Sequence, residues 1–250
     1  MVLHIVLAAL LLAIPAGVLY LLERKMLSSL FIAAARMLVQ VMVLCLMVWA
    51  LMRYDRWWMS LLWVVVMTGY AALVVVHKLK DAKRALIMPV ALGLLAGTLS
   101  VGLYLLLFSL PVERVFDARW LIPVMMLLLG HSLTMTLRGM NTYLSALRKD
   151  EEQYEFRRGN GASHLKAVMP FVRRAFMAVM SPTVANLQTT ALYTMPLLLC
   201  GFLIAGVSPL NAFVVMMMLV IGCVAASVVA LVATLWLADG KLFDSFGKLR

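Results

Sequence analysis

Acidic side chains are scarce in this sequence, and the motifs of catalysis are missing. Only 11 of the 250 residues are Asp or Glu, and none of them lies deep in a long apolar segment. An intramembrane protease or a proton pump needs an ionisable residue at such a place. The sequence also has no GxxxxGK[ST], HExxH or GxSxG pattern. We therefore expect neither ATP hydrolysis nor another catalytic activity on this chain, and no cofactor bound to it.

Cysteine is equally sparse. Cys45, Cys200 and Cys223 stand singly in apolar segments, without a CxxC pair or a Cys/His cluster, so a zinc site or a disulfide framework is not indicated. His131 is the only histidine placed deep in an apolar segment, and we expect it to be a hydrogen-bonded packing residue rather than a ligand. The 20 methionines could bind a soft metal such as Cu(I), but in a bilayer protein they more commonly fill apolar space.

Apolar residues, in contrast, dominate the chain. They make up 65% of it, and the mean hydropathy is +1.01, whereas soluble domains are about 45–50% apolar. A soluble domain of this length could not bury so much apolar surface. The net charge of +11 comes from short basic clusters between apolar segments, a pattern that orients membrane spans and contacts anionic lipid headgroups. We expect a membrane protein that binds lipid and no nucleic acid.

Seven apolar segments reach the length of about 20 residues that a bilayer span requires. Arg36 makes the second segment the weakest of them, because a central arginine costs roughly 2.5–3.5 kcal/mol on the insertion scale. It lies near the segment's end, where it can snorkel, so we predict seven spans and keep six as the alternative. The fold class is then an all-α polytopic membrane bundle, a single transmembrane domain over residues 1–250. The segments are 2–22, 33–52, 57–76, 85–110, 120–137, 183–207 and 210–237.

The basic residues are distributed asymmetrically between the loops. If the N-terminus lies outside, most Lys and Arg residues fall on the inner side, as the positive-inside rule requires. We therefore predict an outer N-terminus and a cytoplasmic C-terminus. Segment 2–22 has no preceding positive charge and is followed by Glu23, Arg24 and Lys25, which indicates an anchor rather than a cleavable signal peptide.

One long polar interval, residues 138–182, separates the fifth and sixth segments. Its first part shows helical spacing that extends the fifth span, and Gly159-Asn160-Gly161 predicts the end of that helix because Gly and Asn accept left-handed backbone. Ser163 can cap the next helix, an amphipathic helix at the membrane surface that ends at Ser181-Pro182. This succession is typical of a lever that passes motion from a soluble partner, although a solvated connector is the alternative. The residues at helical spacing in the first part are Met140, Tyr143, Leu144, Leu147, Glu151 and Tyr154.

A few polar and small residues remain inside the spans. Arg36 and Gln40 share one helix face, and a polar group opens the sixth segment; each set could line a pathway or hold helices together. Small residues four apart predict close helix packing, within the chain or between two copies. The polar group is Asn186, Gln188, Thr189, Thr190 and Thr194, and the small residues are Ala9, Ala13 and Gly17; Gly93 and Gly97; Gly222, Ala226 and Ala230.

Between residues 155 and 212 these features fall into an ordered series of motifs. The series runs E-x5-G-A-S, then P-T-V-x-N, then G-x-S-P-x-x-A, and an R-x-x-x-Q precedes it at Arg36 and Gln40. With them the sequence resembles the Fet-type iron-export permeases of bacterial ABC transporters, which are similar to the plant aluminium-tolerance half-transporters. The resemblance covers nearly the whole chain. The matching residues are Glu155, Gly161, Ala162, Ser163, Pro182, Thr183, Val184, Asn186, Pro196, Gly201, Gly206, Ser208, Pro209 and Ala212.

The chain departs from the family pattern where polar or soft groups are expected. Leu197, Leu198, Leu199, Cys200 and Phe202 stand where the family has Gly, two Met, Thr and Gln. A Tyr-Gln pair of the last span is replaced by Val215 and Met216. The retained residues shape the fold and the loop, so the sequence indicates a divergent member.

The resemblance implies a permease subunit of an ABC transporter in the bacterial inner membrane that exports a metal ion, most simply iron. It implies a pair of permease copies above two separate ATPase subunits, which bind the ATP. The alternatives are an ABC permease for a non-metal cargo, or a membrane scaffold or regulator that recruits a cytoplasmic partner. The implied ATPase-coupling residues are Glu155, Gly159, Gly161, Ala162 and Ser163, and the candidate pathway residues are Arg36, Gln40, Asn186, Gln188 and Thr189.

Overall fold

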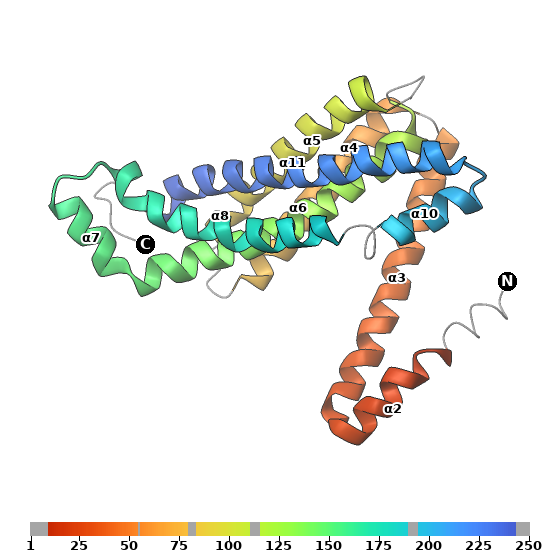
Figure 1. Cartoon of the computed structure of the whole chain (residues 1–250), viewed down its shortest axis with the longest axis horizontal. Helices are drawn as coiled ribbons and strands as arrows, with labels where there is room; N and C mark the ends of the chain where they lie inside the picture. Colours follow the sequence, from red (N-terminus) through yellow and green to blue (C-terminus); the bar gives the residue numbers. More distant parts are fainter. Residues whose placement is uncertain (1–9, 55, 80–83, 111–115, 190–194, 244–250) are drawn as a thin grey trace. The chain divides into compact units, whose positions relative to one another are not determined.

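The apolar segments of the sequence become long helices. The structure is a computed structural model that describes residues 10–54, 56–79, 84–110, 116–189 and 195–243, and it is all-helical (Figure 1). The order of the elements is α2 Ala13–Leu22, α3 Arg24–Tyr54, α4 Trp57–Lys78, the 3₁₀ turn η1 Arg84–Leu86, α5 Ile87–Tyr104, the π-turn η2 Leu105–Ser109, α6 Ala118–Lys149, α7 Glu151–Gly159, α8 His164–Gln188, α10 Met195–Ile204 and α11 Pro209–Leu242.

Five of the described helical stretches are long and apolar enough to cross a membrane: α3, α4, the stretch from η1 to η2, α6 and α11. The all-α membrane fold is thereby confirmed, and the number of spans is compatible with about seven. Segment 2–22 is described only from residue 10, as the shorter apolar helix α2. The sixth predicted segment, residues 183–207, contains the end of α8 and all of α10. Residues 190–194 between these helices, which include Thr190 and Thr194, lie outside the described residues.

The predicted end of a helix at Ser181-Pro182 is wrong. Helix α8 continues through Pro182 to Gln188, although an interior proline disfavours a helix by roughly 3 kcal/mol. Val179 and Thr183 flank the proline and are both buried; Thr183 Oγ1 lies 3.7 Å from Met135 Sδ of α6. Burial against α6 offsets the cost of the proline, which the local sequence does not reveal.

The contacts within the chain cluster in two units, residues 1–55 and 56–250. In the first unit α2 packs on α3, and the most apolar window of α3 has no buried residue. Arg36 and Gln40 are exposed on this helix. The expectation of a single domain over residues 1–250 stays a prediction.

In the second unit, α5 and α11 cross at close range through small residues. A Cβ added at Gly93 would lie 2.7 Å from the backbone nitrogen of Thr234, and one at Gly97 would lie 2.8 Å from that of Ala230. These approaches leave no room for side chains, so the two helices pack backbone to backbone. The small-residue faces of α5 and α11 therefore serve packing within the chain. At Gly17, on α2, an added Cβ would meet nothing within 4 Å.

Helices α6 and α11 run parallel, and α8 returns along α6 (Figure 1). Two hydrogen-bonded pairs connect α6 to α11: His131 with Ser227, and Tyr143 with Asp239. The residues of each pair are 96 positions apart, so the two helices keep the same register over this length. The predicted extension of the fifth span is confirmed as far as Lys149, where α6 ends. Its continuation through Glu151 and Tyr154 in the same helix is wrong, because the chain leaves helical geometry at Asp150 and these residues lie on the separate helix α7. The buried residues of the extension are Met140, Tyr143, Leu144 and Leu147, with Tyr154 following on α7.

Candidate functional site: a helical elbow and an adjoining cavity

The predicted break after α7 is confirmed, and its hydrogen bonds explain it. Gly161 has a φ of 81°, a left-handed conformation that favours glycine. The backbone N–H of Ala162 donates to the carbonyl of Arg157 at 3.0 Å, and the N–H of Gly161 donates to that of Arg158 at 3.0 Å. This pair of bonds is a Schellman motif. We call residues 150–166 the elbow.

The same device recurs between α10 and α11. Gly206 has a φ of 83°, and the N–H of Val207 donates to the carbonyl of Phe202 at 3.0 Å. Pro209 then stands in the first turn of α11, where its missing N–H costs no hydrogen bond. Ser163 and Ser208 are the N-cap residues of α8 and α11, but neither side chain makes a capping hydrogen bond. The two glycine-containing motifs of the sequence thus shape two helix–turn–helix joints.

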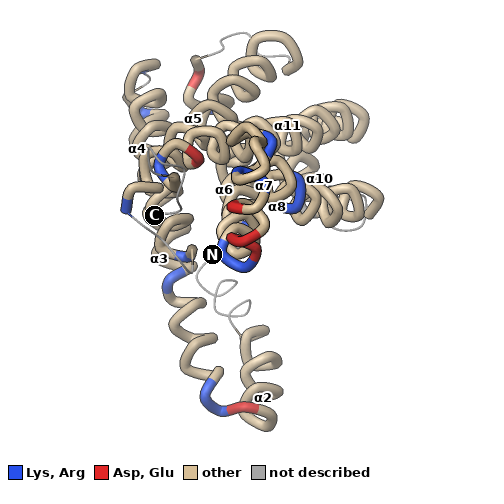
Figure 2. The backbone as a smooth tube through the Cα atoms, turned by 90° about the vertical axis from the view of Figure 1, so that its left-hand side faces the viewer, with Lys and Arg blue, Asp and Glu red and all other residues tan. Residues whose placement is uncertain are grey.

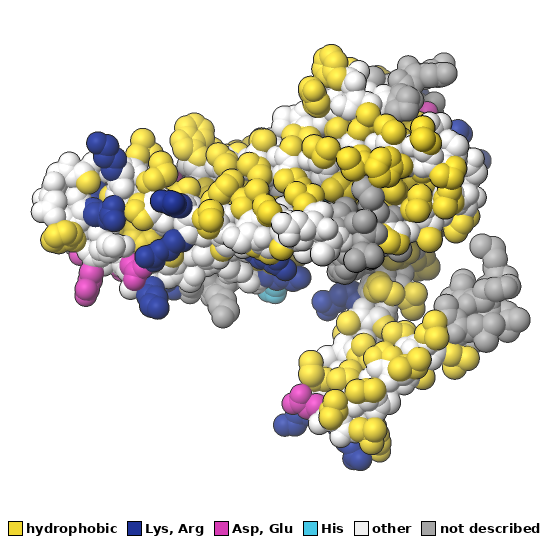
Figure 3. Space-filling view, in the orientation of Figure 1, with side chains coloured by type: hydrophobic (Ala, Val, Ile, Leu, Met, Phe, Trp, Pro, Cys, Tyr) yellow, Lys and Arg dark blue, Asp and Glu magenta, His cyan; other side chains and the backbone are white. Residues whose placement is uncertain are grey.

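The elbow is the charged end of the second unit. Helix α7 has acidic residues in its first turn and basic residues in its last, which matches the helix dipole at both ends. Figure 2 shows charged residues along α7 and the neighbouring ends of α6 and α8, and Figure 3 shows charged side chains gathered at this end of the unit. Glu155 is exposed, Phe156 is 72% exposed and Tyr154 is buried. The elbow therefore presents charge and one aromatic ring outward while Tyr154 anchors it.

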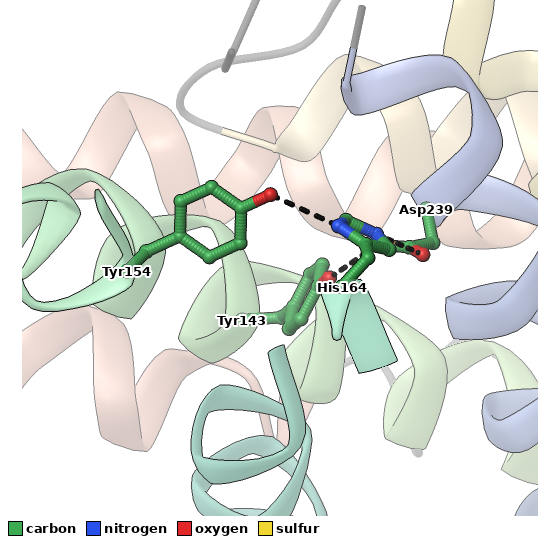
Figure 4. Close-up of polar contacts among 4 residues, drawn as sticks. All are labelled: Tyr143, Tyr154, His164 and Asp239. Atoms are coloured by element: carbon green, nitrogen blue, oxygen red, sulfur yellow. Dashed lines mark hydrogen bonds and ion pairs between the residues drawn. The ribbon is translucent and has the colours of Figure 1, made fainter. Parts of the chain in front are cut away.

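A cluster of four polar residues ties the elbow to the bundle (Figure 4). His164 Nε2 lies 2.8 Å from Asp239 Oδ2, and the Tyr154 hydroxyl lies 2.9 Å from His164 Nδ1. Tyr143 donates to the other carboxylate oxygen, Asp239 Oδ1, at 3.2 Å. With a neutral His164, Nε2 donates to the carboxylate and Nδ1 accepts from Tyr154, so every group in the cluster has a partner. The cluster joins α6, α7, α8 and α11.

Ring contacts and an ion pair reinforce this joint. Phe243 packs against Tyr154 at 5.0 Å and against His164 at 4.7 Å between ring centroids. Burial raises the pKa of the Tyr154 hydroxyl, so the hydroxyl stays protonated and can donate at neutral pH. Asp150, at the end of α6, pairs with Arg174 of α8.

Sequence reasoning missed His164 and Asp239. They are 75 positions apart, and no motif connects them. One signal was available: Asp239 is a single acidic residue at the end of the longest described helix, α11. A carboxylate at the edge of an apolar span is expected to have a partner.

A cavity of about 300 Å³ lies between α6, α8, α10 and α11. Most of its lining is apolar. His131 contacts the cavity and also bonds Ser227 Oγ through Nδ1 at 2.9 Å, so the expected hydrogen-bonded role of this histidine is confirmed. The polar and sulfur-bearing side chains of the lining are His131, Thr134, Met135, Arg138, Thr183, Asn186 and Cys223.

The predicted site residues are only partly brought together. Asn186 lines the cavity, whereas the Thr189 hydroxyl bonds carbonyls of its own helix, such as that of Asn186 at 3.3 Å, and Gln188 is exposed at the end of α8. Arg36 and Gln40 belong to the other unit. The five predicted coupling residues all lie in the elbow. Their assignment to coupling stays a prediction, as does the pathway.

Among the described residues, no three His, Cys, Asp or Glu side chains form a group that could hold a metal ion. Cys45 and Cys200 are exposed, Cys223 is buried, and all three are free thiols.

A family model described as "Uncharacterised protein family (UPF0014)" matches residues 2–243, and the chain belongs to this family. It is 26% identical to the UPF0014 membrane protein slr1647 of Synechocystis sp., over 82% of this chain and 80% of that protein. It is 28% identical to Protein ALUMINUM SENSITIVE 3 of Arabidopsis thaliana, over 58% of this chain and 53% of that protein. It is 26% identical to the UPF0014 membrane protein STAR2 of rice, over 71% of this chain and 63% of that protein.

These relatives confirm the resemblance to the plant aluminium-tolerance group. Identities of 26–28% confirm that this chain is a divergent member of the family. No solved structure matches this chain. Family and helices together make it a multi-pass membrane protein.

Proposed function

We propose that this chain is the permease subunit of an ABC transporter and that the elbow receives the motion of a separate ATPase. The observation that carries the proposal is the cluster in Figure 4, where Tyr154 of the short charged helix α7 bonds His164 of α8, and His164 bonds Asp239 near the end of the long apolar helix α11. Charge asymmetry predicts that this end faces the cytoplasm. A soluble ATPase would meet the elbow there.

The contacts supply a route for the motion. A push on α7 acts on α8 through the Schellman turn and the Asp150–Arg174 ion pair. It acts on α11 through His164 and Asp239. Helix α11 then moves with α5, because their backbones are in close contact at Gly93 and Gly97. The elbow can thus shift three helices of the bundle together.

The finer assignments rest on the resemblance. They are a pair of permease copies, ATP bound by the partner subunit, location in the bacterial inner membrane, and export of a metal ion such as iron. The name of the Arabidopsis relative connects that protein with aluminium, which supports a cargo related to metals. The apolar replacements in and around α10, at Leu198 and Phe202, favour the alternatives instead: a non-metal cargo, or a scaffold that recruits a cytoplasmic partner.

The test uses the full chain in liposomes with each stand-alone ABC ATPase encoded in the same genome, and the substitution Gly161→Pro. Proline fixes φ near −65°, whereas Gly161 needs 81°, so the elbow turn is lost. We expect the variant to insert normally but to lose ATPase stimulation. The matched control is Gly69→Ala on α4, outside the elbow, because an added Cβ at this helical position meets nothing within 4 Å; it should keep full stimulation.

Three outcomes distinguish a permease from a scaffold. Stimulation by the wild type and the control but not by Gly161→Pro supports the permease. Tight association without any stimulation supports the scaffold. No association of the wild-type chain with any ATPase would overturn the proposal.

A further inference from the structure

We propose, building on the permease assignment, that the cavity between α6, α8, α10 and α11 binds the cargo, and that this cargo is an organic anion. Its carboxylate or phosphate group would pair with Arg138, and its apolar part would lie against the leucine and valine walls. A metal ion would then enter only as part of an anionic complex.

The charge of the lining favours an anion. Arg138 is the single Lys, Arg, Asp or Glu side chain among the described residues that line the cavity. It forms no ion pair with any residue in the part of the chain that the structure describes. Arg138 also follows directly on the uncharged stretch 120–137, so it stands where the apolar environment ends. A guanidinium without a carboxylate partner beside an apolar cavity binds anions through charge-assisted, bidentate hydrogen bonds.

Asp239, the acidic residue of α11, is already engaged in hydrogen bonds. Both carboxylate oxygens of Asp239 accept hydrogen bonds, one from Tyr143 and one from His164. Asp239 lies beside Tyr143, which follows Arg138 on α6 by more than one helical turn. It therefore does not compete with a ligand for the guanidinium.

In its neutral form, His131 adds a hydrogen-bond acceptor. The Ser227 hydroxyl donates to the carbonyl of Cys223 at 2.7 Å, so its one proton is used. The bond of 2.9 Å between Ser227 Oγ and His131 Nδ1 must then be donated by the histidine. A neutral imidazole with its proton on Nδ1 keeps a lone pair on Nε2, which can accept a hydroxyl or amide proton from the ligand.

The same lining is unsuited to a bare metal ion. It offers one imidazole, one buried thiol and one thioether, from His131, Cys223 and Met135, but no carboxylate. The sulfur of Met135 already faces the Thr183 hydroxyl at 3.7 Å. Iron-like cations prefer oxygen or nitrogen donors and a site of opposite charge, and the charge of Arg138 repels them.

Size and polarity fit a small amphipathic molecule. A volume of about 300 Å³ is at the lower end of the range for ligand pockets, which are mainly apolar with a few polar groups that fix orientation. Leu127, Leu187 and Val220 supply apolar wall, and Thr134 lies about one helical turn before Arg138 on α6. The expected ligand has one anionic group, a short apolar body and a hydrogen-bond donor.

The test measures equilibrium binding to the purified full-length chain in nanodiscs of neutral phosphatidylcholine. The probes are radiolabelled octanoate, octyl phosphate, the uncharged 1-octanol and Fe²⁺, each corrected with empty nanodiscs. We expect saturable binding of octanoate and octyl phosphate, and at least about tenfold weaker binding by Arg138→Gln. Arg138→Lys, which keeps the charge, should recover part of the loss. The matched control is Arg173→Gln, because Arg173 is exposed on α8 and does not line the cavity.

A second arm separates a soluble anion from a lipid headgroup. In nanodiscs that contain phosphatidylglycerol, a lipid that fills the site would displace octanoate and would remain bound in native mass spectrometry, except in Arg138→Gln. Octanoate binding that is unchanged by this lipid points to a soluble anion. Either result supports an anion site.

Equal octanoate affinity in the wild type and Arg138→Gln, or saturable Fe²⁺ binding that is lost in His131→Ala while no anion binds, would overturn the inference. The outcome is independent of the elbow test, because no ATPase is present. An ATPase that is stimulated by the chain while no anion binds would leave the permease assignment standing. Anion binding by a chain that recruits no ATPase would leave only the binding site.

Discussion

Helix α11 meets its neighbours in two different ways along its length. Against α5 it packs backbone to backbone, through Gly93 and Gly97 on one side and Ala226, Ala230 and Thr234 on the other. At its far end it is joined to α8 by a hydrogen bond between His164 and Asp239, whose side chains are 32% and 19% exposed. Close packing has one arrangement and resists sliding, whereas a polar contact near water can be exchanged for contacts with water. The second unit therefore has a fixed contact between α5 and α11 at Gly93 and Gly97, here called the seam, and a releasable contact between His164 and Asp239, here called the joint.

The largest effect should come from breaking the seam with Gly97→Ala. The new Cβ would meet backbone atoms, the carbonyl oxygen of Ala226 and the nitrogen of Ala230, which cannot rotate away. We expect a loss of about 3 kcal/mol or more in the free energy of unfolding, since overpacking against backbone is at the upper end of such costs. Thermal unfolding in detergent measures it. Gly69→Ala, where an added Cβ meets nothing within 4 Å, should change little; equal losses in both variants would contradict the seam.

The next effect concerns the joint. Asp239→Ala leaves the fully buried Tyr143 hydroxyl without its acceptor, which costs about 1–3 kcal/mol. It also frees His164, so we expect lower ATPase stimulation. In the double variant Tyr143→Phe/Asp239→Ala the orphaned hydroxyl is gone, and most of the stability should return.

Measuring both stability and ATPase stimulation separates the structural role of Asp239 from its role in transmitting motion. Stimulation should stay low in the double variant, because the contact to His164 is still missing. If stimulation recovers together with stability, the His164–Asp239 contact does not transmit motion and Asp239 serves stability alone.

The smallest effect should come from the exposed ion pair between Asp150 and Arg174. Such pairs contribute about 0.2–1 kcal/mol, and salt screens them. Arg174→Gln should therefore lower the unfolding temperature slightly at low ionic strength and hardly at all in high salt. The adjacent Arg173→Gln serves as the control. A large, salt-independent loss in Arg174→Gln would mean that this pair belongs to the fixed part of the unit.

The predictable parts of the fold are those with local causes. The end of α7 at Gly159-Asn160-Gly161 follows from the left-handed backbone that Gly161 accepts, and the extension of α6 follows from its helical spacing of apolar residues. The rule that proline ends a helix failed at Pro182, because packing against α6 outweighs a local preference. The sequence also does not say which small-residue faces meet, whereas the structure packs those of α5 and α11 against each other.

The sequence by itself determined that this chain is a helical membrane protein with a turn at Gly161, since hydrophobicity and backbone sterics act within a few residues. Only the tertiary structure decided that His164 bonds Asp239 across 75 positions and that Arg138 and Asn186 border one cavity. Such contacts depend on the register between helices. That register is set by the close packing of α5, α6, α8 and α11 as a whole, and no short stretch of sequence contains it.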